Sequence, residues 1–394
     1  MKPNIVIFLV DDMGTGDTSA YQDWTGNQDD EQLETPNLER LARMGVRFTD
    51  AHTPSTVCTP TRYALLTGRY CWRTPLKHQV AFGPHYPPLI ELERPTLATI
   101  LKDAGYHTGI SGKWHVGLTY GASDGGPAQG WDDADVRQAL ADCPLDHGFD
   151  YSFITNRSHG SSANAGWIEG RMCIGATGKD DKEIEGYDLH QTGPMNLEHA
   201  IGFLEDHLED GETREKPFFL YYASNSNHTP HTPCDALNGV PVVGQGQFKN
   251  GERELSRPHA TTNDPNGWES TEWGKKRDRV GGCEHNTPER LDFIYENDVA
   301  VGQVLHYLAS HEDPRNPEQN LLANTLFIFS SDNGAENAGK ESSGFYRGRK
   351  AHIHEGGHRV PTIAAWKDGN IGDGDETTPG RTSHICFGFK DLNV

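Results

Sequence analysis

Apolar segments that end abruptly in polar clusters recur along the chain, and they restrict the fold more than any other feature. The first, Asn4 to Val10, is rich in β-branched and aromatic residues without alternating polar positions, and Asp11 and Asp12 follow it directly. Such a run is typical of a strand covered on both faces in a parallel sheet. Three further segments end in polar clusters in the same way: Tyr106 to Ile110, Lys216 to Ala223 and Thr325 to Phe329. Because ligands of open α/β sheets bind beyond the carboxyl ends of the strands, these four ends predict a shared site.

Helical segments alternate with these strands. Thr35-Pro36 is a typical helix start with Gly45 past the end, and the segment Thr96 to Ala104 is followed by Gly105. A long amphipathic helix is predicted to begin at Thr287-Pro288. The alternation indicates the α/β class, with a mostly parallel central sheet and helices on both faces.

The 394 residues are predicted to form one domain, 1–394, and no internal repeat is evident. Two segments interrupt the rhythm, 121–191 and 234–285, and both are rich in glycine and polar residues. We interpret them as long loop insertions over the site and not as separate domains. The stretch from Lys367 to Thr382 is rich in turn residues, and one more strand is predicted around Ile385 to Phe389.

The formal net charge of -22 argues against nucleic acid or an anionic membrane as a partner. An anionic substrate would therefore need a local basic island. The apolar run Ile5 to Val10 is too short for a signal or membrane-spanning segment, which fits a cytoplasmic protein or a chain numbered from a mature or cloned start. The seven cysteines are scattered without a CxxC pair, which indicates neither a disulfide framework nor a zinc knuckle.

The segment Cys58 to Arg69 places a reactive side chain at a predicted helix start. Pro60 suits a first helical turn, and Gly68 can end the helix. Unpaired N–H groups and the helix dipole favour an anion here and would lower the pKa of the Cys58 thiol. Arg62 follows one turn later on the same side. The alternative is a buried structural cysteine near a surface arginine.

Hard oxygen donors gather at two of the predicted strand ends. Asp11 and Asp12 follow the first strand, and Asp332 and Asn333 follow the last. Carboxylate and amide oxygens form a ligand set suited to Ca²⁺ or Mg²⁺. Capping of the loops by the same side chains is the alternative interpretation of each pair.

Basic side chains follow the other strand ends. Lys113 and His115 are two residues apart, so both would point to one face of an extended segment. His228 is a single loop histidine after the third strand, and Lys350 lies in a basic turn that would by default be a solvated surface. These residues indicate a function only if they share a pocket with Cys58.

Taken in order, the motifs resemble those of the formylglycine-dependent sulfatases, within the alkaline phosphatase superfamily. The likeness runs from Asn4 to about Pro361. The motifs are Asn-Ile-Val-Ile-Phe-Leu-Val-Asp-Asp from Asn4, Thr-Pro-Asn-Leu from Thr35, Cys-Thr-Pro-Thr-Arg from Cys58 with Leu-Thr-Gly-Arg, Gly-Lys-Trp-His from Gly112, His-Gly-Phe-Asp from His147, His-Thr-Pro from His228, Ser-Asp-Asn-Gly from Ser331, and Lys350 followed by Glu355-Gly356-Gly357.

This resemblance implies a sulfuric ester hydrolase of the alkaline-phosphatase-like fold, in which a maturation enzyme oxidises Cys58 to formylglycine. The hydrated aldehyde is a geminal diol: one oxygen would attack sulfur, and the other would then expel sulfate. Arg62 would stabilise the diol, and His115 would help to take its proton. The family also implies Ca²⁺, in preference to Mg²⁺, at the modified Cys58 and at Asp11, Asp12, Asp332 and Asn333. Sulfate oxygens would be bound by Lys113, His228 and Lys350, and His228 would protonate the leaving group.

Two features depart from the family pattern. Thr61 stands where serine is commonest, and the small C-terminal subdomain of the family is not evident. The alternatives are a phosphomonoester or phosphodiester hydrolase of the same superfamily and an inactive, truncated sulfatase-like binding protein. A cysteine phosphatase is excluded, because its loop needs five residues between Cys and Arg, and Cys58 and Arg62 are separated by three.

The predicted substrate is a sulfated hexose or hexosamine within a polysaccharide, since the resemblance is closest to carbohydrate-active sulfatases. Members of that family are often periplasmic or secreted. Loop side chains that would line a sugar pocket are Trp72, Arg73, His85, His159 and Trp167, and ordinary loop packing is the alternative interpretation of each.

Overall fold

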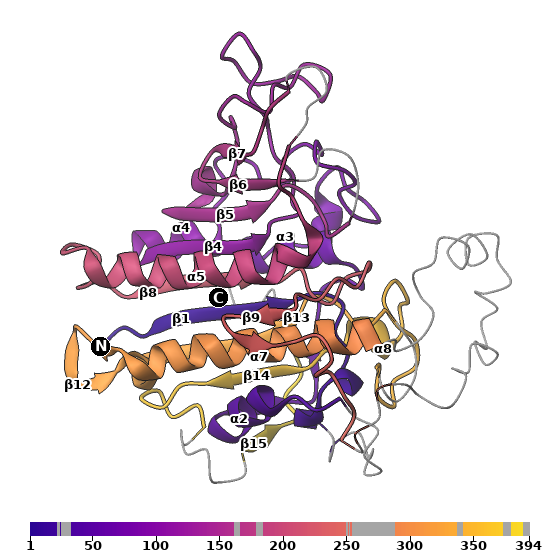
Figure 1. Ribbon diagram of the computed structural model, residues 1–394, viewed down its shortest axis with the longest axis vertical. Helices are drawn as coiled ribbons and strands as arrows, with labels where there is room; N and C mark the ends of the chain where they lie inside the picture. Colours follow the sequence, from indigo (N-terminus) through magenta and orange to yellow (C-terminus); the bar gives the residue numbers. More distant parts are fainter. Residues whose placement is uncertain are drawn as a thin grey trace, which may run out of the picture.

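The computed structural model describes residues 1–21, 24, 33–160, 166–178, 184–249, 251, 253, 288–336, 342–372 and 380–388. A ten-stranded sheet runs through it in the order β15-β2-β14-β13-β1-β8-β4-β5-β6-β7 (Figure 1). Its strands are β1 (Asn4–Val10), β2 (Val46–Phe48), β4 (His107–Lys113), β5 (Tyr151–Thr155), β6 (Trp167–Glu169), β7 (Met172–Ile174), β8 (Phe218–Ala223), β13 (Thr325–Ser331), β14 (Thr362–Ala365) and β15 (Arg381–Ser383).

The five central strands, from β13 to β5, are parallel to one another. Antiparallel neighbours flank them, with β14 and β2 on one side and β6 and β7 on the other, while β15 pairs in parallel with β2. The predicted mostly parallel sheet is therefore confirmed. The remaining short strands are β3 (Ala51–His52), β9 (Ala236–Leu237), β10 (Val240–Pro241), β11 (Glu312–Asp313), β12 (Asn316–Asn320) and β16 (Phe387–Gly388).

Helices cover both faces of the sheet. The helices are α2 (Pro36–Met44), α3 (Cys58–Thr67), α4 (Leu97–Asp103), α5 (Thr192–Glu209), α7 (Pro288–Ser310) and α8 (Glu355–His358). Val6, Phe8 and Val10 of β1 join the core formed with α2, α5 and α7, whereas Ile7 and Leu9 join the core formed with α3 and α4. Because both faces of β1 are buried, its sequence has no polar alternation. None of the described helices is both long and apolar enough to cross a bilayer.

Helix α5 and part of the sheet depart from the prediction. The segment 121–191 was expected to be a loop insertion, yet it contributes β5, β6 and β7 to the sheet. The 18-residue helix α5 was not predicted, since Gly193, Pro194 and Gly202 weaken its local helical signal. Tertiary packing compensates for the weak helical signal. The ring of Phe203 on α5 packs directly on Gly109 of β4, so closely that a Cβ at position 109 would lie 2.7 Å from the ring. Most of the other predicted insertion, 234–285, lies outside the described residues.

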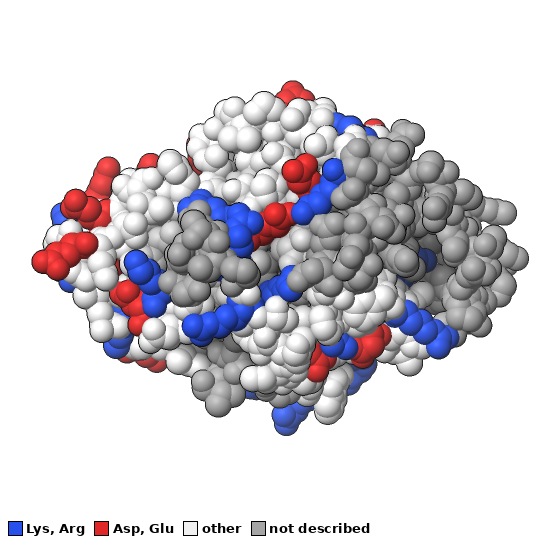
Figure 2. All heavy atoms as spheres, turned by 90° about the horizontal axis from the view of Figure 1, so that it is seen from below, with Lys and Arg blue, Asp and Glu red and all other residues white. Residues whose placement is uncertain are grey.

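The C-terminal strands were predicted only in part. A strand around Ile385 to Phe389 is present as β16, while β15 was not expected. On the face seen in Figure 2, the described lysine and arginine side chains lie among aspartates and glutamates, and the two signs are not separated into large patches.

Two histidines face each other between β4 and α5, with His207 buried and His107 partly buried. The Nδ1 atoms of His107 and His207 are 3.1 Å apart, and burial, followed by the proximity of His107, lowers the pKa of His207 to about 3. The folded chain therefore binds fewer protons than the unfolded chain between about pH 6.5 and 3, so stability is lost as the pH falls through this window. We expect His207 to account for about 2 kcal/mol of lost stability between pH 6.5 and pH 5.

Urea unfolding of the parent and of His207→Gln at both pH values measures this loss. The exposed His306 on α7 supplies the matched control, His306→Gln, which should keep the parental pH dependence. Equal pH slopes in the parent and in His207→Gln would contradict the assignment.

Candidate active site

The carboxyl ends of β1, β13, β4 and β8 meet at one edge of the sheet. Val10 pairs with Ser331 at the ends of β1 and β13, so the residues that follow, Asp11 and Asp332, emerge side by side. The backbone N–H of Asp11 donates to the carbonyl of Ser226 at 3.0 Å, which ties the loop after β8 to the same edge. The polar clusters that the sequence places far apart therefore share one site.

Cys58 is the first residue of α3, as predicted, and Gly68 ends this helix with φ of +63°. The Cys58 side chain is buried, with 2% of the residue exposed. Its Sγ lies within 4.8 Å of carboxylate oxygens of Asp11 and Asp332. The predicted fall in thiol pKa is wrong: burial raises the pKa of Cys58 to about 11 and outweighs the nearby lysines. Unmodified Cys58 is thus a poor thiolate nucleophile here.

Buried ion pairs surround Cys58. Lys113 at the end of β4 donates to Asp11, and Lys350 donates to Asp12. The Nε and Nη2 atoms of Arg62, one turn into α3, each lie 2.9 Å from Oδ2 of Asp332. The structure therefore brings together the lysines, the arginine and the carboxylates that the sequence singled out.

One further carboxylate, Glu336, joins this cluster. It lies 3.7 Å from the Lys350 ammonium and 3.5 Å from Nε2 of His231. The site therefore holds more carboxylates than permanent cations, so the expected local excess of positive charge is absent from the protein alone. The cations are Arg62, Lys113 and Lys350, and the carboxylates are Asp11, Asp12, Asp332 and Glu336. An added divalent cation would reverse this balance and let the site accept an anion.

The oxygen donors at the edge fit a hard divalent cation. Oδ1 of Asp11 and Oδ1 of Asn333 are buried and accept no hydrogen bond from any residue that the structure describes. The Nδ2 group of Asn333 donates to Oδ1 of Asp12 at 2.6 Å. This hydrogen bond fixes the orientation of the amide, so that Oδ1 of Asn333 is the atom that can bind a cation. Burial, and then the charge of Asp11, raises the pKa of Asp332 to about 7. A bound Ca²⁺ or Mg²⁺ would satisfy these oxygens and favour the charged carboxylates.

His115 departs from the expected geometry. Lys113 ends β4 and His115 has φ of +56°, so the two do not lie in one extended segment. Nε2 of His115 donates to the carbonyl of Ala81 at 2.9 Å, and Nδ1 is buried without a hydrogen-bond partner among the described residues. Burial, and then the charges of Lys113 and Arg62, lowers the pKa of His115 well below its usual value. The ring is therefore neutral, with a lone pair on Nδ1.

His228 lies on the loop after β8 with 17% of its side chain exposed. Nδ1 is 2.6 Å from the carbonyl of Thr229, which leaves Nε2 directed to Ser158 Oγ at 3.4 Å and to Asp12 Oδ2 at 4.0 Å. Burial, and then Lys350, lowers its pKa well below the usual value. His228 thus stands between the carboxylate cluster and solvent.

His231 and Glu336 were not predicted as site residues. Each lies three residues beyond a predicted one, His231 after His228 and Glu336 after Asn333. The repeat His-Thr-Pro-His-Thr-Pro was the available signal for His231. For Glu336, spacing alone carries no signal, because its contact with Lys350 depends on the tertiary fold.

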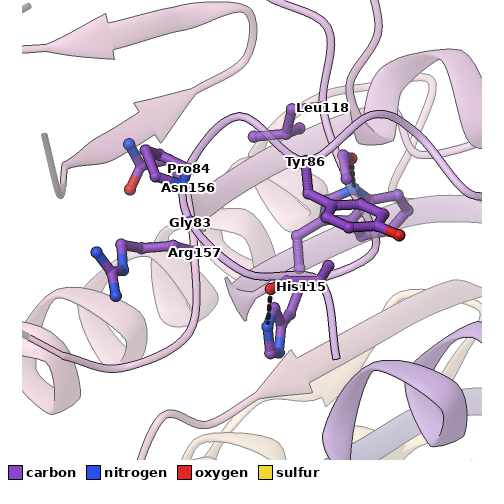
Figure 3. Close-up of a pocket in the computed structure, with 10 residues that line it drawn as sticks. Gly83, Pro84, Tyr86, His115, Leu118, Asn156 and Arg157 are labelled. Carbon is purple, nitrogen blue, oxygen red and sulfur yellow. Dashed lines mark hydrogen bonds between the residues drawn. The ribbon is translucent and has the colours of Figure 1, made fainter. Parts of the chain in front are cut away.

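A small pocket opens beside His115 (Figure 3), with an empty volume of about 220 Å³ that includes open solvent. Tyr86, Asn156 and Arg157 contribute its larger polar side chains. Of the predicted sugar-pocket residues, Trp72 is exposed, but Trp167 is in β6 and stacks on a core phenylalanine.

His159, the other predicted pocket residue in this part of the chain, is buried. Its Nε2 lies 3.0 Å from the carbonyl of Pro230 and 2.9 Å from Oγ1 of Thr232. The prediction that His159 and Trp167 line a sugar pocket is therefore wrong, and His159 braces the loop that carries His228.

Comparison with known proteins agrees with this geometry. The family model described as Sulfatase matches residues 3–387. The chain belongs to the sulfatase family. It is 28% identical to an N-acetylgalactosamine-6-O-sulfatase of Bacteroides thetaiotaomicron, over 93% of this chain and 68% of that sulfatase. It is 30% identical to human arylsulfatase A, over 94% of this chain and 60% of the human protein. The predicted family is thereby confirmed, and the chain spans about two thirds of the length of these relatives.

Solved sulfatase-like structures share the fold. One comes from work on the metabolism of multiple glycosaminoglycans by Bacteroides thetaiotaomicron, with a TM-score of 0.69, 22% identity, and coverage of 100% of this chain and 76% of that one. Another, a sulfatase from Pseudoalteromonas, has a TM-score of 0.61 and 22% identity, and covers 100% of this chain and 66% of that one. The described residues of the chain thus have the fold of these solved structures.

Proposed function

We propose that the chain hydrolyses sulfate monoesters, with Cys58 converted to formylglycine and a divalent cation, Ca²⁺ before Mg²⁺, at the strand ends. The observation that carries this proposal is the position of Cys58: it begins a helix, lies within reach of two carboxylates, and is surrounded by three buried cations. Family membership and the activities named for the relatives support it.

The cation and the modified cysteine supply different chemistry. Asp11, Asp12, Asp332 and Asn333 would hold the cation, whose role when bound is to polarise an oxygen nucleophile and offset negative charge. The formylglycine, as its hydrate, supplies that oxygen nucleophile, for which the buried thiol with its raised pKa is poorly suited.

The side chains of this chain position the ester and move protons. Arg62, Lys113 and Lys350 place fixed positive charge beside Cys58, where negative charge on sulfate oxygens would otherwise be repelled by the carboxylates. Nδ1 of neutral His115 is the basic atom suited to accept the proton of the attacking hydroxyl. Nε2 of His228 is directed to Ser158 Oγ and Asp12 Oδ2. It would protonate the departing alcohol oxygen from the imidazolium form, because in the neutral ring the proton is on Nδ1, which donates to the Thr229 carbonyl.

Two measurements test this function together. The protein is produced with a formylglycine-generating enzyme, and the peptide that contains Cys58 is examined by mass spectrometry for the aldehyde. The same preparation is assayed with Ca²⁺ on 4-nitrophenyl sulfate and 4-nitrophenyl phosphate. We expect the aldehyde and a higher rate on the sulfate ester. An unmodified thiol together with no sulfate release, in protein from a host that contains the formylglycine-generating enzyme, would contradict the proposal.

A phosphoester hydrolase is the second candidate, because Asp12, His228 and Glu336 form another group of possible metal ligands. Two-metal phosphatases would use such a second site. Here the Lys350 ammonium already donates to Asp12 and lies 3.7 Å from Glu336, so a cation of the protein itself occupies this position. This favours the one-metal sulfatase, and a faster rate on the phosphate would favour the alternative.

The proposed substrate class is a sulfated carbohydrate. The N-acetylgalactosamine-6-O-sulfatase named above acts on such a sugar, and Tyr86 and Arg157 line the pocket beside His115 with a phenol and a guanidinium, groups that hydrogen-bond to hydroxyl or acidic substituents. A set of mono- and oligosaccharides with sulfate at defined positions would identify the preferred sugar. Turnover of small aryl sulfates alone would count against a carbohydrate substrate.

His115→Gln tests the assigned proton acceptor. Glutamine can still donate to Ala81 but has no basic nitrogen, so we expect kcat to fall by roughly 10² to 10⁴-fold while KM changes little. Steady-state kinetics with Ca²⁺ present measure both constants, and thermal unfolding checks the fold. A parental kcat in a folded His115→Gln protein would remove His115 from the mechanism.

A further inference from the structure

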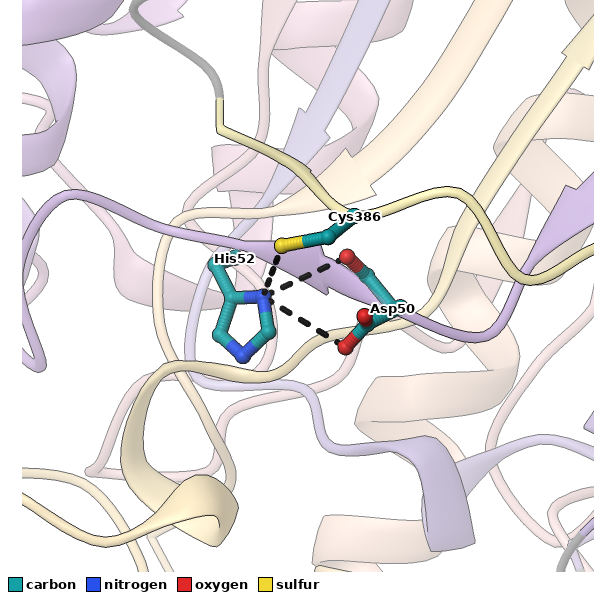
Figure 4. A group of neighbouring side chains, drawn as sticks. All are labelled: Asp50, His52 and Cys386. Carbon is teal, nitrogen blue, oxygen red and sulfur yellow. Dashed lines mark hydrogen bonds and ion pairs between the residues drawn. The ribbon is translucent and has the colours of Figure 1, made fainter.

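A second group of metal-ligating side chains lies where β16 runs beside β3 (Figure 4). Asp50 and His52 lie at β3, and Cys386 directly precedes β16. The two short strands pair in parallel, with Ala51 opposite Phe387 and His52 opposite Gly388. This pairing carries Cys386 to the two earlier residues. None of the three belongs to the active-site cluster around Cys58.

The three donor atoms converge on one point. Nδ1 of His52 lies 3.7 Å from Sγ of Cys386 and 3.7 Å from Oδ1 of Asp50, and the three atoms all lie within 4.8 Å of one another. Tetrahedral zinc with bonds of about 2.0 to 2.3 Å separates its ligand atoms by roughly 3.3 to 3.8 Å. The two measured separations fall in this range. The N···O separation is long for a direct hydrogen bond, whereas the N···S separation also fits a weak hydrogen bond with sulfur.

The opposite nitrogen of His52 supplies an independent observation. Nε2 lies 3.3 Å from Oε2 of Glu355, and the Glu355 carboxylate is itself held by Arg359 at 3.0 Å. Nδ1 also lies 3.3 Å from the Asp50 carbonyl, to which it would donate in the other tautomer. In the tautomer whose Nε2 proton is directed to Glu355, the lone pair of Nδ1 faces Asp50 and Cys386. A carboxylate behind a histidine is the arrangement that orients metal-ligating imidazoles.

The charge around His52 also suits a dication. Arg359 contacts both carboxylates, with Nη2 at 3.1 Å from Asp50 Oδ1 and Nη1 at 3.0 Å from Glu355, so one guanidinium serves two negative groups. A thiolate on Cys386 would add a third negative charge. A divalent ion would therefore leave the group close to neutral.

We propose that Asp50, His52 and Cys386 form a zinc site that fastens the C-terminal strand β16 to β3. Sulfur and imidazole ligands select Zn²⁺, whereas the all-oxygen donors at the strand ends suit Ca²⁺. Cys386 is exposed, so an ion can enter from solvent and a water can complete the tetrahedron. Binding replaces the S–H bond by a Zn–S bond, and the proton is released to solvent.

Cobalt titration tests the site, because Co²⁺ replaces Zn²⁺ and reports a thiolate ligand through a sulfur-to-cobalt charge-transfer absorption. The parent for this experiment is Cys58→Ala, saturated with Ca²⁺, so that the active-site thiol cannot contribute. We expect one equivalent of Co²⁺ to produce the absorption and one equivalent of Zn²⁺ to remove it. Absence of the absorption in the folded parent would overturn the proposal.

Variants decide which residues bind. In the same background, Cys386→Ser and His52→Gln should lose the absorption, while His358→Gln should keep it. His358 is the matched control, because it belongs to the alternative group on the Nε2 side with His52 and Glu355. Absorption that survives Cys386→Ser would assign the thiolate elsewhere and reject the site.

Zn²⁺ should also raise the Tm of the parent and leave the Tm of Cys386→Ser unchanged. Equal shifts in Tm would reject the proposal that zinc attaches β16 to β3.

Discussion

Replacing Cys58 by alanine is expected to lower kcat/KM for a sulfate ester by at least about 10³-fold. The proposed nucleophile is made from this side chain, and alanine offers neither a thiol to oxidise nor an oxygen to attack. Since Cys58 is buried at the first position of α3, the smaller side chain should leave the helix in place. The decrease should therefore appear in kcat, measured under saturating Ca²⁺ on 4-nitrophenyl sulfate.

A second buried cysteine provides the control. Cys71 lies just beyond α3 and contacts Oγ1 of Thr74 at 3.8 Å, away from the carboxylates. Cys71→Ala should keep the parental kcat even if it lowers the Tm. A Cys58→Ala protein with parental activity would show that the chemistry uses another nucleophile.

Asp332→Asn is expected to eliminate Ca²⁺ binding and to destabilise the fold by about 3 to 5 kcal/mol. The carboxylate of Asp332 pairs with the buried Arg62 through two contacts of 2.9 Å, and its loss leaves that guanidinium with the more distant Asp11, at 3.7 Å, as its carboxylate partner in the core. It also removes one of the proposed ligands. Isothermal titration with CaCl₂ at pH 8 measures the first effect, and urea unfolding measures the second.

Asp313→Asn separates the two effects. Asp313 is also buried and pairs with an arginine, Arg315, at 2.8 Å, but it lies on β11 and away from the carboxyl ends of the central strands. We expect this variant to be destabilised and still to bind Ca²⁺. If Asp332→Asn bound Ca²⁺ with the parental affinity, Asp332 would not be a ligand.

The strand ends were predictable because a parallel sheet brings them together by construction. Once Asn4–Val10 and Thr325–Ser331 are recognised as buried strands, their last residues must place Asp11 and Asp332 at the same edge. Gly68 and Gly45 marked the ends of α3 and α2 through local backbone preferences. The apolar composition of buried strands and the glycine at helix ends are local properties, so they can be recognised from the sequence alone.

Tertiary effects explain the failures. Helix α5 contains helix-weakening residues and is stabilised by its packing on the sheet. The thiol pKa of Cys58 depends on burial, which here outweighs the helix dipole that the local sequence suggested. His159 turned out to brace the His228 loop because its hydrogen-bond partners, Pro230 and Thr232, come from a distant segment.

Because β1 lies in the middle of the sheet, its neighbour β13 is synthesised long after it, and the site cannot be completed until then. Asp12 and Asp332 approach each other although 320 residues separate them, so the site closes only after β13 has left the ribosome and paired with β1. In the closed site Cys58 is out of reach of another protein. The enzyme that would oxidise Cys58 under the proposed function would therefore have to act while the chain is still growing or only partly folded. The time available for the proposed modification would be set by how fast the ribosome reaches β13 and how soon β13 pairs with β1.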